Sequence, residues 1–129
     1  MAPTELEKVL ASLRIERRRA SYTYVAVDAA TTLDPGIDAL IREGEGISAV
    51  VSLDEAAARG WPVGVELAWL TVAAETSLEA VGITAALSGA LSRAGIAANV
   101  LAALHHDHLL VPVADVDRAV LGLEGLRPS

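Results

Sequence analysis

The sequence predicts an α+β protein with a ferredoxin-like fold, in which helices cover one face of an antiparallel sheet. The length of 129 residues suggests one compact unit, or two very small subdomains that share a core, and an apolar content of 53% is enough for a real core. The stretch 65–113 has the pattern of a strand, a long helix, a strand, a tight turn and a strand, and a further helix follows. This order, β-α-β-β-α, is the ferredoxin-like pattern without its last strand. We therefore expect strands from the first half of the chain to complete the sheet, so that the two halves are intimately paired.

The first residues favour a short helix followed by a strand. Residues 4–12 place apolar side chains at helical spacing, and Thr4 with Glu7 has the pattern of a capping box. The charged residues 14–20 indicate a link between elements. The aromatic and β-branched residues at 22–27 then predict a strand.

A hairpin and a short helix are predicted next. Residues 38–43 and 47–53 have the pattern of two strands, and the Gly and Glu residues at 43–46 suit the tight turn between them. Asp54 is expected to cap the helix 55–59, because its carboxylate can accept a hydrogen bond from a free backbone N–H of the first turn.

The second half supplies the order of elements on which the fold prediction depends. Its strongest strand, residues 65–73, is apolar on both faces and is expected to be central in the sheet. The segment 75–77 is expected to end this strand and open the long helix, whose buried stripe is rich in small residues. The elements that follow are a strand at 96–103, a turn at 104–106, a strand at 107–113 and a last helix that Asp115 caps.

Composition excludes several classes of protein. The formal net charge of −7 argues against a nucleic-acid surface, which needs clustered Lys and Arg. The absence of cysteine excludes disulfides, thiolate metal sites and a cysteine nucleophile. The N-terminus lacks an apolar signal core, and no stretch approaches the roughly 20 apolar residues that span a bilayer. We therefore expect a cytoplasmic protein that binds neither nucleic acid nor membrane.

The central helix carries a resemblance to a known family. The residues Ala80 to Leu91, followed by Arg93-Ala94-Gly95-Ile96, resemble the signature of ACT domains, in which a Gly opens the first helix. The chain is similar to small bacterial ACT-domain proteins, and its C-terminal half to the ACT modules of amino-acid sensors. The resemblance implies a degenerate N-terminal ACT-like half at 1–63 and an ACT domain at 64–129. It departs from the family where Ala80-Val81 replaces the usual acidic residue and Pro.

The resemblance also implies a ligand site, because ACT domains typically bind an amino acid between two modules. The contacts it carries over are Ser77, Leu78, Gly82 and Asp107, and Thr76 can add a hydroxyl bond. A helix N-terminus suits a ligand carboxylate because its first N–H groups are free. Two other interpretations stay open, namely plain helix capping by the hydroxyl residues and close helix–sheet packing at the glycine.

A cluster of His side chains lies in the predicted turn and strand that follow. On a strand, His106 and His108 would point to one face, and His105 and Asp107 to the other. The imidazoles could bond to backbone or to Asp107, contribute to a ligand site, or bind a metal. A zinc site needs a third ligand that the sequence does not supply. We therefore expect neither a metal nor a cofactor.

These observations predict a regulatory or sensory ACT module that binds a small molecule, expected to be an amino acid. Without an effector domain, its output would pass through a homo-oligomer or a protein partner. The alternative is a ligand-free module for oligomerisation or protein interaction. We do not expect an enzyme, because the sequence contains no nucleophile elbow, P-loop or Gly-x-Gly-x-x-Gly motif.

Overall fold

The chain forms two compact units in the computed structural model, which describes residues 4–74 and 82–128. Unit 1 combines the two ends of the chain, Met1–Arg18 and Trp69–Ser129, and unit 2 is Arg19–Ala68. The N-terminal helix therefore belongs with the C-terminal part of the chain. The predicted division of the chain at residues 63 and 64 stays a prediction.

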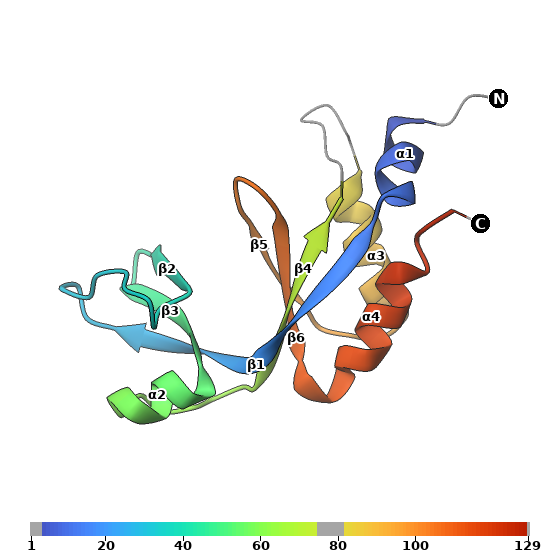
Figure 1. Ribbon diagram of the computed structural model, residues 1–129. Helices are drawn as coiled ribbons and strands as arrows, with labels where there is room; N and C mark the ends of the chain where they lie inside the picture. The colour runs from blue at the N-terminus through green and yellow to red at the C-terminus, as the bar shows by residue number, and fades with distance from the viewer. Residues whose placement is uncertain (1–3, 75–81, 129) are drawn as a thin grey trace. The chain divides into compact units, whose positions relative to one another are not determined.

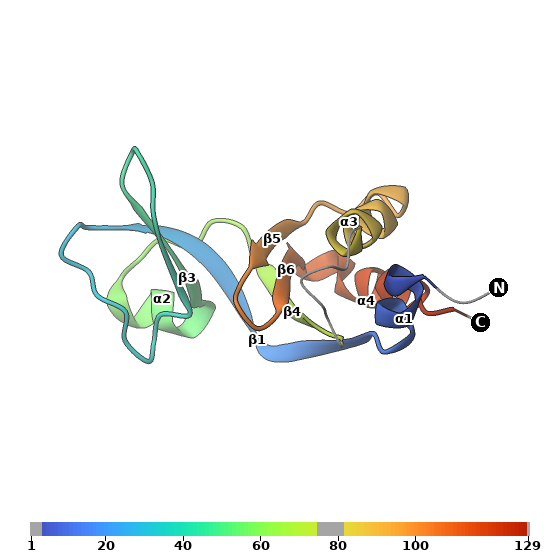
Figure 2. The same ribbon diagram turned by 90° about the horizontal axis from the view of Figure 1, so that it is seen from above.

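Unit 1 is a sheet with helices on one face. Its strands have the order β1-β4-β6-β5, where β1 contributes its first residues. Both views show α1, α3 and α4 on the same side of these strands (Figures 1 and 2). The elements of this unit are α1 (Glu5–Ala11), the start of β1 (Arg14–Val27), β4 (Leu67–Ala73), α3 (Ile83–Arg93), β5 (Asn99–Ala102), β6 (Asp107–Pro112), a 3₁₀ turn (Val113–Asp115) and α4 (Val116–Glu124). The α+β, ferredoxin-like prediction is thus confirmed.

The core of unit 1 forms where strand and helix side chains meet. Fully buried leucines come from β4, α3, β6, α4 and the residue before β1, and they are Leu13, Leu70, Leu87, Leu91, Leu109, Leu110 and Leu123. All seven residues of β4 are buried or half-buried, as expected for a central strand. β5 and β6 form the predicted antiparallel pair, in which Asn99 lies opposite Leu110 and Ala102 opposite Asp107.

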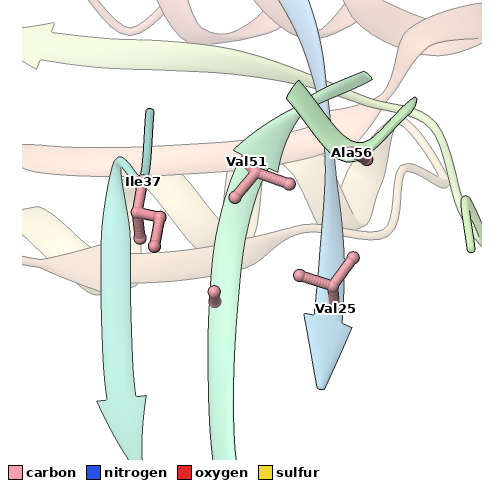
Figure 3. Packing of buried hydrophobic residues seen from close by; sticks show 5 residues of the cluster. Val25, Ile37, Val51 and Ala56 are labelled. Carbon is pink, nitrogen blue, oxygen red and sulfur yellow. The ribbon is translucent and has the colours of Figure 1, made fainter. Parts of the chain in front are cut away.

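Unit 2 is a three-stranded antiparallel sheet with one helix. The strand order is β2-β3-β1, from β2 (Ala39–Arg42), β3 (Ile47–Ser52) and the rest of β1, and α2 is Leu53–Arg59. The predicted turn closes the hairpin, since Glu43 and Gly46 exchange backbone hydrogen bonds. Figure 3 shows the small core that results. Its buried residues are Val25, Ile37, Ala49, Val51 and Ala56.

Of the predicted helix caps, the first is confirmed and the second is wrong. Thr4 accepts a hydrogen bond from the Glu7 N–H at 3.1 Å, and Glu7 accepts one from the Thr4 N–H, so the capping box is confirmed. The expected cap Asp54 is wrong, because α2 begins one residue before it. Ser52 holds the N-cap, and its hydroxyl accepts from the Glu55 N–H.

The last helix has its predicted start but not the predicted cap. Asp115 occupies the N-cap position of α4 without a side-chain bond to the backbone. Its carboxylate accepts a hydrogen bond from Arg118 at 2.9 Å instead. A cation one turn into the helix thus satisfies the carboxylate that would otherwise accept from a backbone N–H.

The predicted link at 14–20 is wrong, because β1 begins at Arg14 and runs to Val27. Ladder hydrogen bonds join backbone groups, so charged side chains do not prevent a strand when they can point away from the core. Charge alone was therefore a poor indicator of a link.

The predicted strand start at residue 96 is also wrong, since β5 begins at Asn99. Gly95 has a φ of 71°, and the N–H groups of Ile96 and Gly95 donate to the carbonyls of Leu91 and Ser92. These two bonds form a Schellman motif. Ile96 is buried at this helix end, and its backbone N–H bonds to the helix instead of to a neighbouring strand.

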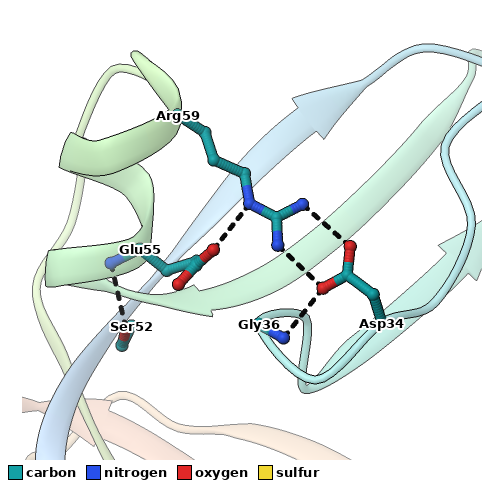
Figure 4. A network of polar contacts seen from close by, with 5 residues as sticks. All are labelled: Asp34, Gly36, Ser52, Glu55 and Arg59. Atoms are coloured by element: carbon teal, nitrogen blue, oxygen red, sulfur yellow. Dashed lines mark hydrogen bonds and ion pairs between the residues drawn. The ribbon is translucent and has the colours of Figure 1, made fainter.

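A polar network ties α2 to the loop before β2 in unit 2 (Figure 4). The Arg59 guanidinium donates two hydrogen bonds to Asp34, at 2.7 and 3.0 Å, and one to Glu55 at 2.7 Å. The Gly36 N–H also donates to Asp34. The Arg59 bonds, and then the Gly36 bond, lower the pKa of the Asp34 carboxyl below its ordinary value. The network closes the loop through charge-assisted bonds.

Candidate functional site

The glycine expected at the ligand site opens α3. Gly82 is the N-cap of this helix, and the Ala86 N–H donates to its carbonyl at 2.8 Å. Its φ of 95° lies in the left-handed region, and no side chain caps the helix there. Among the described residues, a Cβ built on Gly82 would meet Leu6 of α1, at 3.5 Å, which is ordinary contact. The positive φ therefore is the reason for glycine at this position that the structure shows.

Gly82→Ala is expected to lower the free energy of unfolding by about 1 kcal/mol, because an L side chain is disfavoured at a positive φ. Gly122→Ala is the matched control, since Gly122 lies inside α4 and a Cβ there meets no atom within 4 Å. The control should gain roughly 0.5–1 kcal/mol from better helix propensity. Urea denaturation measures both, and equal effects of the two substitutions would contradict the conformational argument.

The other predicted site residues fall into two groups. Thr76, Ser77 and Leu78 lie outside the described residues. Asp107 is the first residue of β6 and is half-buried. Within the described part of the chain, no hydrogen bond or ion pair joins Asp107 to Gly82, which lie on different elements. Their shared role in a ligand site stays a prediction.

His108 is the most connected member of the His cluster. The indole N–H of Trp69 on β4 donates to His108 Nδ1 at 3.1 Å, and the Thr71 hydroxyl lies 3.0 Å from the same nitrogen. The indole can only donate, so Nδ1 must accept and the proton of the neutral ring belongs on Nε2. His108 was expected to bond to backbone or to Asp107, but its Nδ1 contacts two side chains of β4 instead. The neighbouring strand therefore selects the tautomer.

The surroundings of His108 disfavour its charged form. Burial of the imidazole lowers the pKa of His108 below its ordinary value, and the positive charges of Arg18 and His106 add to this effect. Asp107 acts in the opposite direction. Protonation at Nδ1 would also remove the acceptor that Trp69 uses. The structure therefore holds a neutral imidazole at this position.

A cation also stacks on the ring of the same indole. The Arg18 guanidinium of β1 lies 3.8 Å from the centre of the Trp69 ring, and Trp69 is only 3% exposed. The preceding residue, Arg17, reaches Asp117 on α4. Adjacent strand residues point to opposite faces of the sheet. Arg17 therefore lies on the face that the helices cover, and Arg18 lies on the opposite face. We call this second face the Trp69 face; it carries Arg14, Arg18, Trp69, Thr71 and His108.

A cavity lies beside the end of this face. Its volume is about 280 Å³, and it is lined by Ser12, Arg14, Ala73, Ala74 and His106. These residues come from the start of β1, the end of β4 and the β5–β6 turn, all within unit 1. His106 and His108 have their rings 6.4 Å apart, which confirms that they share a face. The cavity thus includes one member of the His cluster, His106, in its lining.

Other kinds of site were sought in the described residues. In residues 4–74 and 82–128, no group of three or more His, Cys, Asp or Glu side chains could hold a metal ion. No helix within these ranges is long and apolar enough to cross a membrane.

Sequence reasoning missed Arg14, Ser12 and the partners of His108. Arg14 and Arg18 were assigned to a link, although their even spacing is that of one face of a strand. That alternation was the signal that could have identified them. No comparable signal in the sequence joins Trp69 to His108, because their contact depends on which strands pair.

Comparisons of the sequence with protein families match both parts of the chain to one family. One ACT-domain family model matches residues 65–124 and another matches residues 2–66. Among curated proteins, none matches the chain.

Comparisons with solved structures find proteins of similar fold. A Vibrio cholerae protein of unknown function, titled a possible transport protein, is 30% identical with a TM-score of 0.86, over 95% of this chain and 96% of that one. An aspartate kinase from Clostridium acetobutylicum is 11% identical with a TM-score of 0.69, over 90% of this chain but 34% of that one. The ligand-free regulatory subunit of aspartate kinase from Thermus thermophilus is 10% identical with a TM-score of 0.60, over 94% of this chain and 100% of that one. The likeness to the kinases concerns the fold alone.

Proposed function

Because this chain belongs to the ACT-domain family, we propose that it is a regulatory module that binds an amino acid or a related small metabolite. The observation that carries the proposal is the pair of family matches, which together reach from residue 2 to residue 124. The module has no catalytic role in this proposal. Its output passes through a homo-oligomer or a partner protein, whose population the ligand shifts.

The opening of α3 supports a ligand site at the predicted place. The first N–H groups of a helix have no partner within the helix, and Gly82 leaves them without a side-chain cap. We propose that Thr76, Ser77, Leu78 and Gly82 surround the ligand there, and that Asp107 holds its amino group. The role of Asp107 rests on its charge and on its place at the start of β6.

Structural neighbours favour a regulatory role over a catalytic one. Two of them are regulatory parts of aspartate kinases, namely a regulatory subunit and a putative C-terminal regulatory domain. The present chain matches nearly the whole of each at 10–12% identity. By analogy, we propose that this chain senses a small metabolite and serves a regulatory role.

The proposal predicts that at least one amino acid raises the melting temperature of the purified protein. Ligands that bind only the folded state stabilise it by RT ln(1 + [L]/Kd), so screening each of the twenty amino acids at about 10 mM detects even weak binding. Asp107→Asn should reduce the affinity for the amino acid that binds by about tenfold or more, since it removes one partner of a charged pair.

Asp117→Asn is the matched control for this experiment. Asp117 is exposed on α4 and, among residues 4–74 and 82–128, pairs with Arg17 alone, so the control changes the charge equally without touching β6. An unchanged affinity in Asp107→Asn would remove Asp107 from the site. A screen in which no amino acid shifts the melting temperature would contradict the proposed function.

The second candidate is a ligand-free interaction module. One observation favours it: β5 is the last strand in the sheet of the described residues, next to β6, and the nearby side chains of Val100 and Leu104 are 37% and 91% exposed. Strand edges with apolar side chains are suited to pairing with another chain. Concentration-dependent self-association with no effect of any amino acid would favour this candidate.

A further inference from the structure

We propose that Arg14 and His106 form the site that receives the carboxylate of the small-molecule ligand, in the cavity beside the Trp69 face. The inference rests on the proposed function and gives the ligand carboxylate a place that the family resemblance does not supply, in this cavity instead of at the first N–H groups of α3. It is carried by the cavity, by the charge that lines it, and by the contacts of the neighbouring arginines.

The cavity brings together groups from three places in the sequence. Arg14 is the first residue of β1, Ala73 is the last of β4, and His106 immediately precedes β6. The volume of about 280 Å³ lies near the lower end of ligand pockets, which run from roughly 300 to 1,000 Å³. The cavity therefore favours a metabolite of amino-acid size over a nucleotide or a larger cofactor.

Arg14 is held at the cavity without a carboxylate of its own. Within the described residues, its side chain makes no ion pair or hydrogen bond. Other arginines of unit 1 do pair with carboxylates, as Arg17 does with Asp117, Arg118 with Asp115 and Arg127 with Glu124. Acidic residues exceed basic ones by 17 to 10 in this chain. Among residues 4–74 and 82–128, Arg14 thus has no acidic partner, and it lines a hollow that an external anion can enter.

The lining groups suit an amino acid in particular. A guanidinium presents paired N–H groups that match the two oxygens of a carboxylate, and an imidazole N–H can donate a further bond. The Ser12 hydroxyl, which donates to the Val9 carbonyl at 2.9 Å, adds a polar group to the lining. Ala73 and Ala74 add small apolar walls. This combination selects for a carboxylate and a compact, partly apolar body.

The test compares two charge-matched variants of the full chain. Arg14→Gln removes the proposed anchor, and Arg17→Gln removes the same charge from the helix face of the same strand. His106→Gln tests the second donor. Binding is measured by isothermal titration with the amino acid that gives the largest thermal shift, and with acetate, propionate and ethylamine as simple probes. Circular dichroism establishes that each variant is folded.

We expect Arg14→Gln to weaken the affinity for the amino acid at least about tenfold, His106→Gln to weaken it by a smaller factor, and Arg17→Gln to leave it unchanged. Propionate should bind in the same Arg14-dependent way, and ethylamine, which lacks a carboxylate, should bind far more weakly. This pattern would support both the site and the proposed function.

The remaining outcomes separate the two proposals. Amino-acid binding that is equal in Arg14→Gln and in the unsubstituted protein would overturn the carboxylate site and leave the proposed function intact. Arg14-dependent binding of propionate or acetate without binding of any amino acid would support the site and overturn the amino-acid function. Absence of binding by all the probes would overturn both.

Discussion

Leu123→Ala will lower the free energy of unfolding by about 3 kcal/mol, as is typical when a buried leucine is cut back to alanine. Leu123 lies on α4 and is 0% exposed, and it belongs to the core that β4, α3, β6 and α4 build together. Removing its side chain leaves a cavity that the surrounding strands and helices fill only in part. Urea denaturation followed by far-ultraviolet circular dichroism measures the loss.

Leu121→Ala provides the control on the same helix. Leu121 is 74% exposed, so the same chemical change should alter the free energy of unfolding by no more than about 0.5 kcal/mol. Similar decreases in the free energy of unfolding of the two variants would mean that Leu123 does not face the core. The packing of α4 against β6 and α3 would then have to be revised.

Acidification will destabilise the protein through His108. The folded state lowers the pKa of this imidazole, whereas in the unfolded chain it keeps its ordinary value of about 6.5. Below that pH, the unfolded chain binds a proton that the folded chain does not bind, so the free energy of unfolding decreases. The contribution of His108 is complete above the unfolded pKa and is lost as the pH falls through the lower, folded pKa.

The groups that face His108 determine this behaviour. Arg18 of β1 and His106 beside β6 disfavour a second positive charge, and Asp107 partly offsets them. Trp69 and Thr71 of β4 contact Nδ1, so a proton there would displace the indole N–H. Loss of that bond adds to the cost of charging the ring.

Urea denaturation at about pH 7.5 and about pH 5 tests the His108 prediction. His108→Asn keeps an acceptor near Nδ1 but cannot titrate, so its free energy of unfolding should depend less on pH than that of the unsubstituted protein. His105→Asn, in the exposed turn before β6, is the matched control and should keep the original dependence. An equal pH dependence in all three proteins would refute the assignment to His108.

The order of elements in the second half could be predicted because it depends on local patterns. The apolar run that became β4, the small residues of α3 and the turn before Asp107 each have a period or a turn signal that neighbouring residues carry. The same holds for the Thr4–Glu7 capping box, whose two partners lie three residues apart. The glycine that opens α3 was identified through the family signature, and its φ of 95° supplies the physical reason.

Errors arose where a local signal competed with a distant contact. Charge at Arg14 to Arg19 indicated a link, but the strand β1 begins there because its backbone pairs with strands that are far away in the sequence. Ile96 has the character of a strand residue, yet it completes the end of α3. Asp54 is a good capping residue, but the helix begins one residue earlier, so the cap passes to Ser52.

The fold class, the family and the glycine at the start of α3 could be predicted because each depends on residues that are close together along the chain. Long-range contacts of the folded chain are needed to show that Arg14 and His106 share a cavity, that Trp69 and Thr71 select the tautomer of His108, and that Arg18 stacks on the indole. These contacts join residues up to about ninety positions apart. They exist because pairing β1, β4 and β6 in one sheet puts alternate side chains of three distant segments on a common face.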